Sequence, residues 1–102
     1  MYLINYTEEA LDDLAHFRKP ERQMILDEID HQLTYEPILE TKNRKHLHPN
    51  QLAEWELRIG KYRIFYDVIE PAETAAIQSV KIEAVGFKKH NKLFIRGKEF
   101  KL

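Results

Sequence analysis

The sequence of 102 residues contains no cysteine, only three glycines and four prolines, and no long hydrophobic run. Without cysteine, a disulfide framework, a cysteine-based zinc site and a cysteine nucleophile are all excluded. No apolar run approaches the roughly 18 residues of a membrane span, and the N-terminus lacks the regions of a signal peptide. We therefore expect a cytoplasmic protein without membrane association, built as one domain over residues 1–102.

Charge is distributed unevenly along the chain, although the net charge is only −1. Residues 81–102 carry seven lysines or arginines against two glutamates, whereas residues 1–80 carry nine against fifteen acidic residues. A basic end on an acidic body suggests an anionic partner bound on one face. A solvated charged tail explains the same composition equally well.

The N-terminal third is patterned as one strand followed by two helices. Residues 2–6 alternate as a short strand, and Thr7 then offers an N-cap to a first helix. Pro20 suits the first turn of a second helix, and Glu36-Pro37 ends its pattern. Each helix is apolar on one side only, so we expect a helical hairpin lying on a sheet. The expected apolar positions are Ala10, Leu11, Leu14 and Phe17 in the first helix and Ile25, Leu26, Ile29 and Leu33 in the second.

Residues 38–53 follow no regular hydrophobic period and are interpreted as a loop that leads into the sheet. The segment holds a basic cluster of Lys42, Arg44, Lys45, His46 and His48. His46 and His48 alternate and could meet one ion, but no carboxylate or third histidine stands at a supporting spacing. No metal site is therefore predicted.

The clearest pattern is a β-hairpin over residues 54–69. Odd positions are apolar from 54 to 59, and even positions are apolar from 62 to 68, on either side of Gly60-Lys61. Two alternating strands joined by Gly-Xaa are typical of a hairpin with a two-residue type II′ turn. Residues 70–74 are interpreted as a second turn, and further strands are expected at 77–85 and around 93–95.

The resulting fold class is α+β, with an N-terminal strand, a helical hairpin and an antiparallel sheet of three to four strands packed on the helices. In the strand at 77–85 we expect Val80, Ile82 and Ala84 to face the core.

A tight turn at Gly60-Lys61 pairs Arg58 with Arg63 on the polar face of the hairpin, with Cβ atoms about 5 Å apart. Like charges placed directly opposite each other destabilise a sheet, so the arrangement has no structural benefit of its own. Two planar guanidinium groups are well suited to hold a phosphate. The alternative is that Glu56, Asp67 or Glu83 neutralises each arginine in an exposed ion pair.

The segment Trp55–Tyr66, WELRIGKYRIFY, resembles the W-x-L-R-x-G-x-Y-R-x-x-Y core of the RelE/ParE superfamily of bacterial toxins. Residues 80–89, ending in Gly86-Phe87-Lys88-Lys89, are similar to the last central strand of that family and its basic exit. The resemblance implies the RelE-like fold and the toxin component of a type II toxin–antitoxin system, held inactive by a cognate antitoxin protein.

The resemblance leaves three functions open. RelE-type members cut mRNA on the ribosome as mRNA interferases, without a metal or other cofactor. ParE-type members inhibit DNA gyrase. A third alternative is a relative that has lost toxicity and serves as an interaction module.

For a metal-independent endoribonuclease, the resemblance implies roles for several basic residues. Arg63 matches the phosphate-binding arginine of the family, Arg58 assists it, and Lys88 falls where the family places a second basic residue. The residues expected to bind nucleic acid around them are Lys89, His90, Lys45 and Lys92.

The chain departs from the RelE pattern at three positions. Glu54 and Glu56 stand where lysines are common, and Phe94 stands where a tyrosine is expected. The general acid and base are therefore left open. The alternatives in this sequence are Lys89, His90 and the His46/His48 pair.

Overall fold

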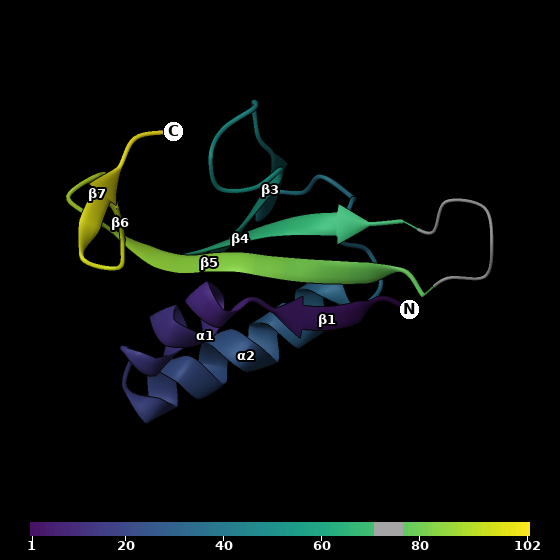
Figure 1. The fold of residues 1–102 in the computed structure, drawn as a ribbon, viewed down its shortest axis with the longest axis horizontal. Coiled ribbons are helices and arrows are strands. Elements are labelled where there is room, and N and C mark those ends of the chain that lie inside the picture. Colours follow the sequence, from purple (N-terminus) through teal and green to yellow (C-terminus); the bar gives the residue numbers. More distant parts are fainter. Residues whose placement is uncertain (71–76) are drawn as a thin grey trace.

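Two helices lie against one face of a strongly twisted sheet (Figure 1). The computed structural model describes residues 1–70 and 77–102, so most of the turn expected at 70–74 falls outside the described residues. The helices are α1 (Glu8–Ala15) and α2 (Lys19–Leu33). Neither is long and apolar enough to cross a membrane.

Within the described residues the sheet has seven strands, which are β1 (Leu3–Tyr6), β2 (Arg44–His46), β3 (Trp55–Ile59), β4 (Tyr62–Ile69), β5 (Ser79–Lys89), β6 (Lys92–Ile95) and β7 (Lys98–Phe100). Their order is β2-β3-β4-β5-β6-β7, with antiparallel neighbours throughout, and β1 pairs with β5 in parallel. The α+β class, the N-terminal strand and the helical hairpin are confirmed. The sheet is larger than the three to four strands expected.

The helices begin and pack for the reasons that the sequence indicates, with one exception. Thr7 caps α1, because its hydroxyl accepts a hydrogen bond of 3.0 Å from the backbone N–H of Ala10. Pro20 lies in the first turn of α2, and Ile25 and Ile29 are fully buried. Leu11 was expected in the core but is 53% exposed, because α1 turns residues 10, 13 and 14 toward the sheet instead.

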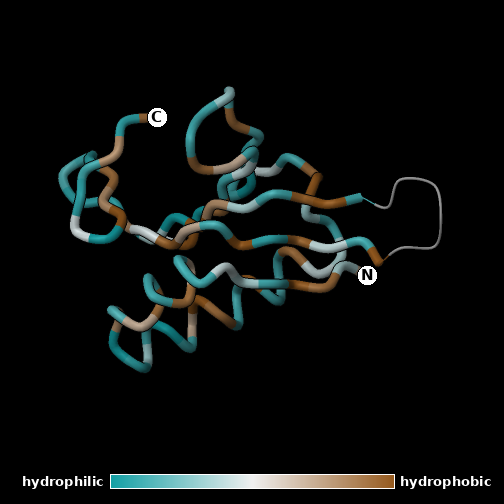
Figure 2. The backbone as a smooth tube through the Cα atoms, in the orientation of Figure 1, coloured by the Kyte–Doolittle hydropathy of each residue, from teal (hydrophilic) through white to brown (hydrophobic). Residues whose placement is uncertain are grey.

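Hydrophobic side chains form a cluster on each face of the sheet. The main cluster lies between the sheet and the helices, and the hydropathy alternates along the central strands accordingly (Figure 2). The second cluster lies on the opposite face, around Phe65 and Leu93. The outer face is therefore partly covered, by the loop before β3 and by the C-terminal strands.

A β-bulge at Glu83 changes which face the following residues of β5 point to. Phe65 pairs with Ala84 but Tyr66 pairs with Ile82, so Glu83 has no partner on β4. The expectation that Ala84 faces the helices with Val80 and Ile82 is therefore wrong. Ala84 belongs to the second cluster on the outer face.

Three tight turns order the second half of the chain. Gly60 has a φ of 55° and Lys61 does not have a positive φ, the combination that a type II′ turn requires. The turns after β5 and β6 each have two successive residues with positive φ, at His90-Asn91 and at Arg96-Gly97. The basic tail is therefore folded into two short hairpins.

Residues 44–46, expected to lie in a loop, form the edge strand β2. Arg44 is buried, and its guanidinium donates a 2.6 Å hydrogen bond to the carbonyl of Gln32 in the last turn of α2. The carbonyls at the end of a helix lack partners within the helix and carry partial negative charge. Arg44 thus fixes β2 to α2 and is not part of a free basic surface.

Replacing Arg44 with alanine is expected to lower the free energy of unfolding by about 2 kcal/mol, since a charged hydrogen bond to a part-buried carbonyl at the end of α2 is lost. The neighbouring substitution Lys45→Ala, at an exposed position of the same strand, should change it by less than about 0.5 kcal/mol. Urea unfolding followed by circular dichroism measures both. Equal effects of the two substitutions would contradict the role assigned to Arg44.

The pH dependence of stability is expected to contain a contribution from Glu83. Burial raises the pKa of the Glu83 carboxyl, the carboxyl of Asp67 raises it further, and Lys81, 3.6 Å away, partly offsets both. The folded state therefore binds the proton more tightly than the unfolded state. This contribution is fully present below the ordinary glutamate pKa and is lost as the pH rises through the raised value.

The substitution Glu83→Gln removes this titration. The free energy of unfolding of Glu83→Gln minus that of the unchanged chain should therefore become more positive as the pH rises from 4 to 8. Thermal unfolding of both proteins across that range measures this difference. Glu99→Gln, at an exposed position of β7, removes one negative charge as the matched control. A pH profile of Glu83→Gln that runs parallel to that of the unchanged chain would refute the assignment.

Candidate functional site

The register of the hairpin places two arginines side by side on the outer face. Arg58 pairs directly with Arg63, as the turn at Gly60-Lys61 predicts. Leu57 and Ile64, the neighbouring pair, belong to the core on the helix side, and successive strand residues point to opposite faces. Gly86 on β5 stands opposite Arg63 on its other side, so a residue without a side chain completes this row.

Arg58 is held by an acidic neighbour on its own strand. Its Nε lies 2.8 Å from a carboxylate oxygen of Glu56, whose side chain is almost fully buried. The Arg58 side chain itself remains partly exposed. The ion-pair alternative considered above is therefore realised for Arg58, with Glu56 as the partner.

Arg63 is held by carbonyl groups. One terminal nitrogen donates to the carbonyl oxygens of Gly60, at 2.7 Å, and Tyr62, at 2.9 Å, while the buried Nε has no hydrogen-bond partner. Burial lowers the pKa of the Arg63 guanidinium, Glu56 raises it and Arg58 lowers it again. Within the described residues Arg63 forms no ion pair.

A groove of about 340 Å³ opens on this face between β3 and the C-terminal strands. It brings together three of the residues singled out in the sequence, Arg58, Lys88 and Lys92. Cations outnumber carboxylates along its walls. The charged lining residues are Glu56, Arg58, Lys88, Lys92, Glu99 and Lys101.

The other predicted site residues lie around the groove without lining it. Arg63 is next to Arg58, and Lys45 pairs with Glu56 from the exposed edge strand β2. Lys89 pairs with Lys92 at the end of the β5–β6 hairpin, and His90 lies in the turn between them. Lys45 therefore lies on the same face as the groove, whereas Lys89 follows Lys88 along β5 and points to the opposite face.

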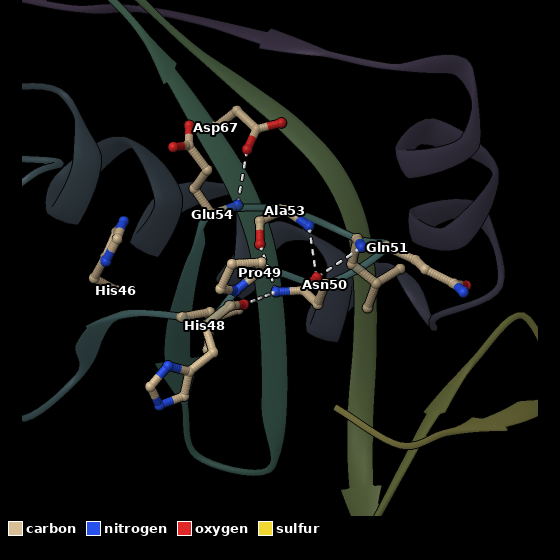
Figure 3. A pocket seen from close by; sticks show the side chains of 10 residues that line it. His46, His48, Pro49, Asn50, Gln51, Ala53, Glu54 and Asp67 are labelled. Atoms are coloured by element: carbon tan, nitrogen blue, oxygen red, sulfur yellow. Dashed lines mark hydrogen bonds between the residues drawn. The ribbon is translucent and has the colours of Figure 1, made fainter.

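His46 and His48 line a different hollow, of about 370 Å³, beside the loop before β3 (Figure 3). Their rings lie apart (Figure 3). The ring of His46 packs edge-on against Trp55, with ring centroids 5.0 Å apart. Asn50 shapes the loop by accepting hydrogen bonds from the backbone of Leu52 and Ala53. Across residues 1–70 and 77–102, no three histidine or carboxylate side chains are placed to hold a metal ion.

Glu56 is a residue of the groove that the sequence predicted only as the partner of an exposed ion pair. Its carboxylate is instead almost fully buried at the groove wall, bonded to Arg58. The available signal was its position two residues before Arg58, which puts both side chains on one face of a strand. Phe94, in contrast, stacks on Phe87 at 5.8 Å and lines a cavity on the other side of the sheet.

No protein-family model matches the sequence, and no curated protein matches it by sequence. Solved structures match its fold. The toxin–antitoxin complex RelBE2 from Mycobacterium tuberculosis superposes with a TM-score of 0.67 at 21% identity, covering 85% of this chain and 98% of that one. A YoeB/ParE toxin from Agrobacterium tumefaciens gives 0.63 at 14% identity, covering 85% and 99%. The chain therefore has the fold of the RelE/ParE toxins.

Proposed function

We propose that this chain is the toxin of a type II toxin–antitoxin pair and acts as a metal-independent endoribonuclease on ribosome-bound mRNA. The observation that carries this proposal is the pair Arg58–Arg63 beside a basic groove that also contains a buried carboxylate. The fold shared with two toxins supports the same assignment.

The arrangement contains the groups that cleavage of RNA by its own 2′-hydroxyl needs. The 2′-oxygen attacks the adjacent phosphorus, the bond to the 5′-oxygen breaks, and a 2′,3′-cyclic phosphate and a 5′-hydroxyl result. One group must accept the 2′-proton, cations must stabilise the charge on the phosphorane, and an acid must protonate the leaving oxygen.

We assign these roles to residues that share the outer face. Arg63 holds the non-bridging oxygens of the scissile phosphate, and Arg58 turns from Glu56 toward the same phosphate. Glu56, released from Arg58, accepts the proton of the 2′-hydroxyl. Lys88, from the wall of the groove, stabilises the developing charge and protonates the 5′-oxygen.

The surrounding cations bind the RNA backbone without reading its sequence. Lys45 and Lys92 flank the reacting phosphate on the outer face, and Lys89 and His90 contact the strand where it passes the end of the β5–β6 hairpin. Contacts of this kind release counterions, so binding should weaken steeply as salt is added. Codon selection then depends on the ribosome and on the shape of the groove.

The proposed protein partner, which holds the toxin inactive, is an antitoxin. One of the solved structures named above is a toxin–antitoxin complex. By analogy, a small protein encoded next to this chain would hold it inactive until that protein is degraded.

Replacing Arg63 with alanine is expected to abolish growth arrest on induced expression and to reduce transcript cleavage by about 10²- to 10³-fold. Primer extension on a reporter transcript measures the cuts. Arg18→Ala removes an exposed arginine at the start of α2 and serves as the control with unchanged activity. Full toxicity of a folded Arg63→Ala variant would defeat the assignment.

Replacing Glu56 with glutamine keeps the size of the side chain and a hydrogen-bond acceptor for Arg58 but removes the proton acceptor. Cleavage should fall by about 10²- to 10⁴-fold while binding to RNA is retained. Fluorescence anisotropy with a labelled oligonucleotide and primer extension, measured on the same preparation, separate the two effects. Loss of binding in parallel with cleavage would mean that Glu56 is only structural.

Inhibition of DNA gyrase is the second candidate function, because Arg58 is neutralised by Glu56 and Phe94 has no hydroxyl to exchange a proton. The same induction experiment distinguishes it. Codon-dependent cuts support the endonuclease, whereas a DNA-damage response without cuts supports gyrase inhibition. Harmless overexpression in the absence of an antitoxin would identify an interaction module.

A further inference from the structure

A third hollow, a cavity of about 670 Å³, lies on the helix side of the sheet between α1, the end of β5 and the turn after β6. The β5–β6 hairpin separates it from the outer groove. Leu93 lines the groove and the next residue, Phe94, lines this cavity, as the alternation of a strand requires. The proposed cleavage reaction makes no use of this cavity.

Three phenylalanines form the apolar walls of the cavity. Phe87 and Phe94 are stacked, and Phe17 meets Phe87 edge-on with ring centroids 6.4 Å apart. All three remain partly exposed. Aromatic rings of this kind attract a cationic head group and pack against its apolar stem.

A buried carboxylate lies at the base of the cavity. Asp13 is 4% exposed, and its Oδ2 accepts a 2.9 Å hydrogen bond from the backbone N–H of Val85. Oδ1 lies 3.0 Å from Nε of Arg96 but is not hydrogen-bonded to it, and it has no other partner. A buried carboxylate oxygen without a hydrogen bond is costly, and a well-directed donor would relieve that cost.

The remaining charged groups around the cavity are already engaged, apart from Asp12. Glu21 accepts a hydrogen bond from the Tyr62 hydroxyl, and Lys61 lies over the ring of Tyr62. The ring nitrogen of His16 contacts the backbone carbonyl of Asp12, at 2.7 Å. The Asp12 side chain forms no ion pair among the described residues and leaves a second carboxylate at the rim.

The approach to the cavity favours a cation over a phosphate. Helix α1 contains Glu8, Glu9, Asp12 and Asp13 and no lysine or arginine. The nearest cation to Asp13 is the guanidinium of Arg96, which is partly exposed on a two-residue turn. The cavity thus already holds one guanidinium group, that of Arg96 from the same chain, which pairs with Asp13 without forming a hydrogen bond.

We propose that this cavity receives an arginine side chain from a basic segment of a partner protein. The incoming guanidinium displaces Arg96, hydrogen-bonds to Oδ1 of Asp13 and pairs with Asp12, while its apolar stem packs on the phenylalanines. That the partner is an antitoxin rests on the proposed function, whereas the preference of the cavity for a cation does not.

The proposal is tested on the full chain by NMR, titrating N-acetyl-arginine amide and following the backbone amides of Val85 and Gly97. Saturable shifts are expected at both. N-acetyl-citrulline amide, which has nearly the same shape but no charge, should bind about tenfold more weakly. Guanosine monophosphate should leave these two amides unchanged. Equal binding of citrulline, or a stronger response to the nucleotide, would overturn the proposal.

Three variants sharpen the test. Asp12→Asn should weaken arginine binding about threefold, whereas Glu9→Gln, a charge removed from the same helix away from the cavity, should not change it. Arg96→Gln should strengthen binding because it removes the internal competitor. Weaker binding of N-acetyl-arginine amide to Arg96→Gln would mean that Arg96 does not compete with the ligand, and the proposal would be wrong.

The experiment is independent of RNA cleavage. Arg63→Ala is expected to leave the arginine titration unchanged, because Arg63 does not line this cavity. Arg63→Ala without effect on toxicity would therefore count against the endonuclease alone. An absent arginine response, in the unchanged chain and in Arg96→Gln, would count against the cavity alone.

Discussion

The register between β3 and β4 is the constraint on which the rest of the structure depends. A slip of β4 by one residue against β3 would turn Ile64 to the outside and carry Arg63 into the core. Burying a guanidinium without a partner costs several kcal/mol, so the hydrophobic face excludes the alternative registers. Gly60, with its positive φ, begins the two-residue turn that closes the hairpin in the one register that remains.

Two like charges opposite each other are tolerated because each has its own local partner. Glu56 neutralises Arg58, while carbonyl oxygens of Gly60 and Tyr62 orient Arg63 without cancelling its charge. The two arginines therefore differ in availability. An anion that approaches this face competes with a carboxylate for Arg58 but only with neutral carbonyls for Arg63, which makes Arg63 the better first contact.

The elements that the sequence predicted are those whose signal is local. The helices and the 54–69 hairpin follow from periodicity and turn residues, and so does the register that pairs Arg58 with Arg63. The strand β2 and the bulge at Glu83 depend on contacts with distant residues. The same limit applies to the sites. Lys88 and Lys92 were indicated by the family resemblance and the basic end of the chain, whereas a buried Asp13 looks like any polar residue of a short helix.

The net charge of −1 says little about what this molecule binds, because cations outnumber carboxylates in the outer groove and carboxylates outnumber lysines and arginines in the helix-side cavity. The molecule measures 44 × 30 × 25 Å, while screening at physiological salt acts over about 8 Å. A ligand at the outer groove therefore responds to Lys88, Lys92 and Lys101, and one at the helix-side cavity responds to Asp12 and Asp13. If both proposals hold, the β5–β6 hairpin separates a surface for an anion from a surface for a cation on a nearly neutral chain.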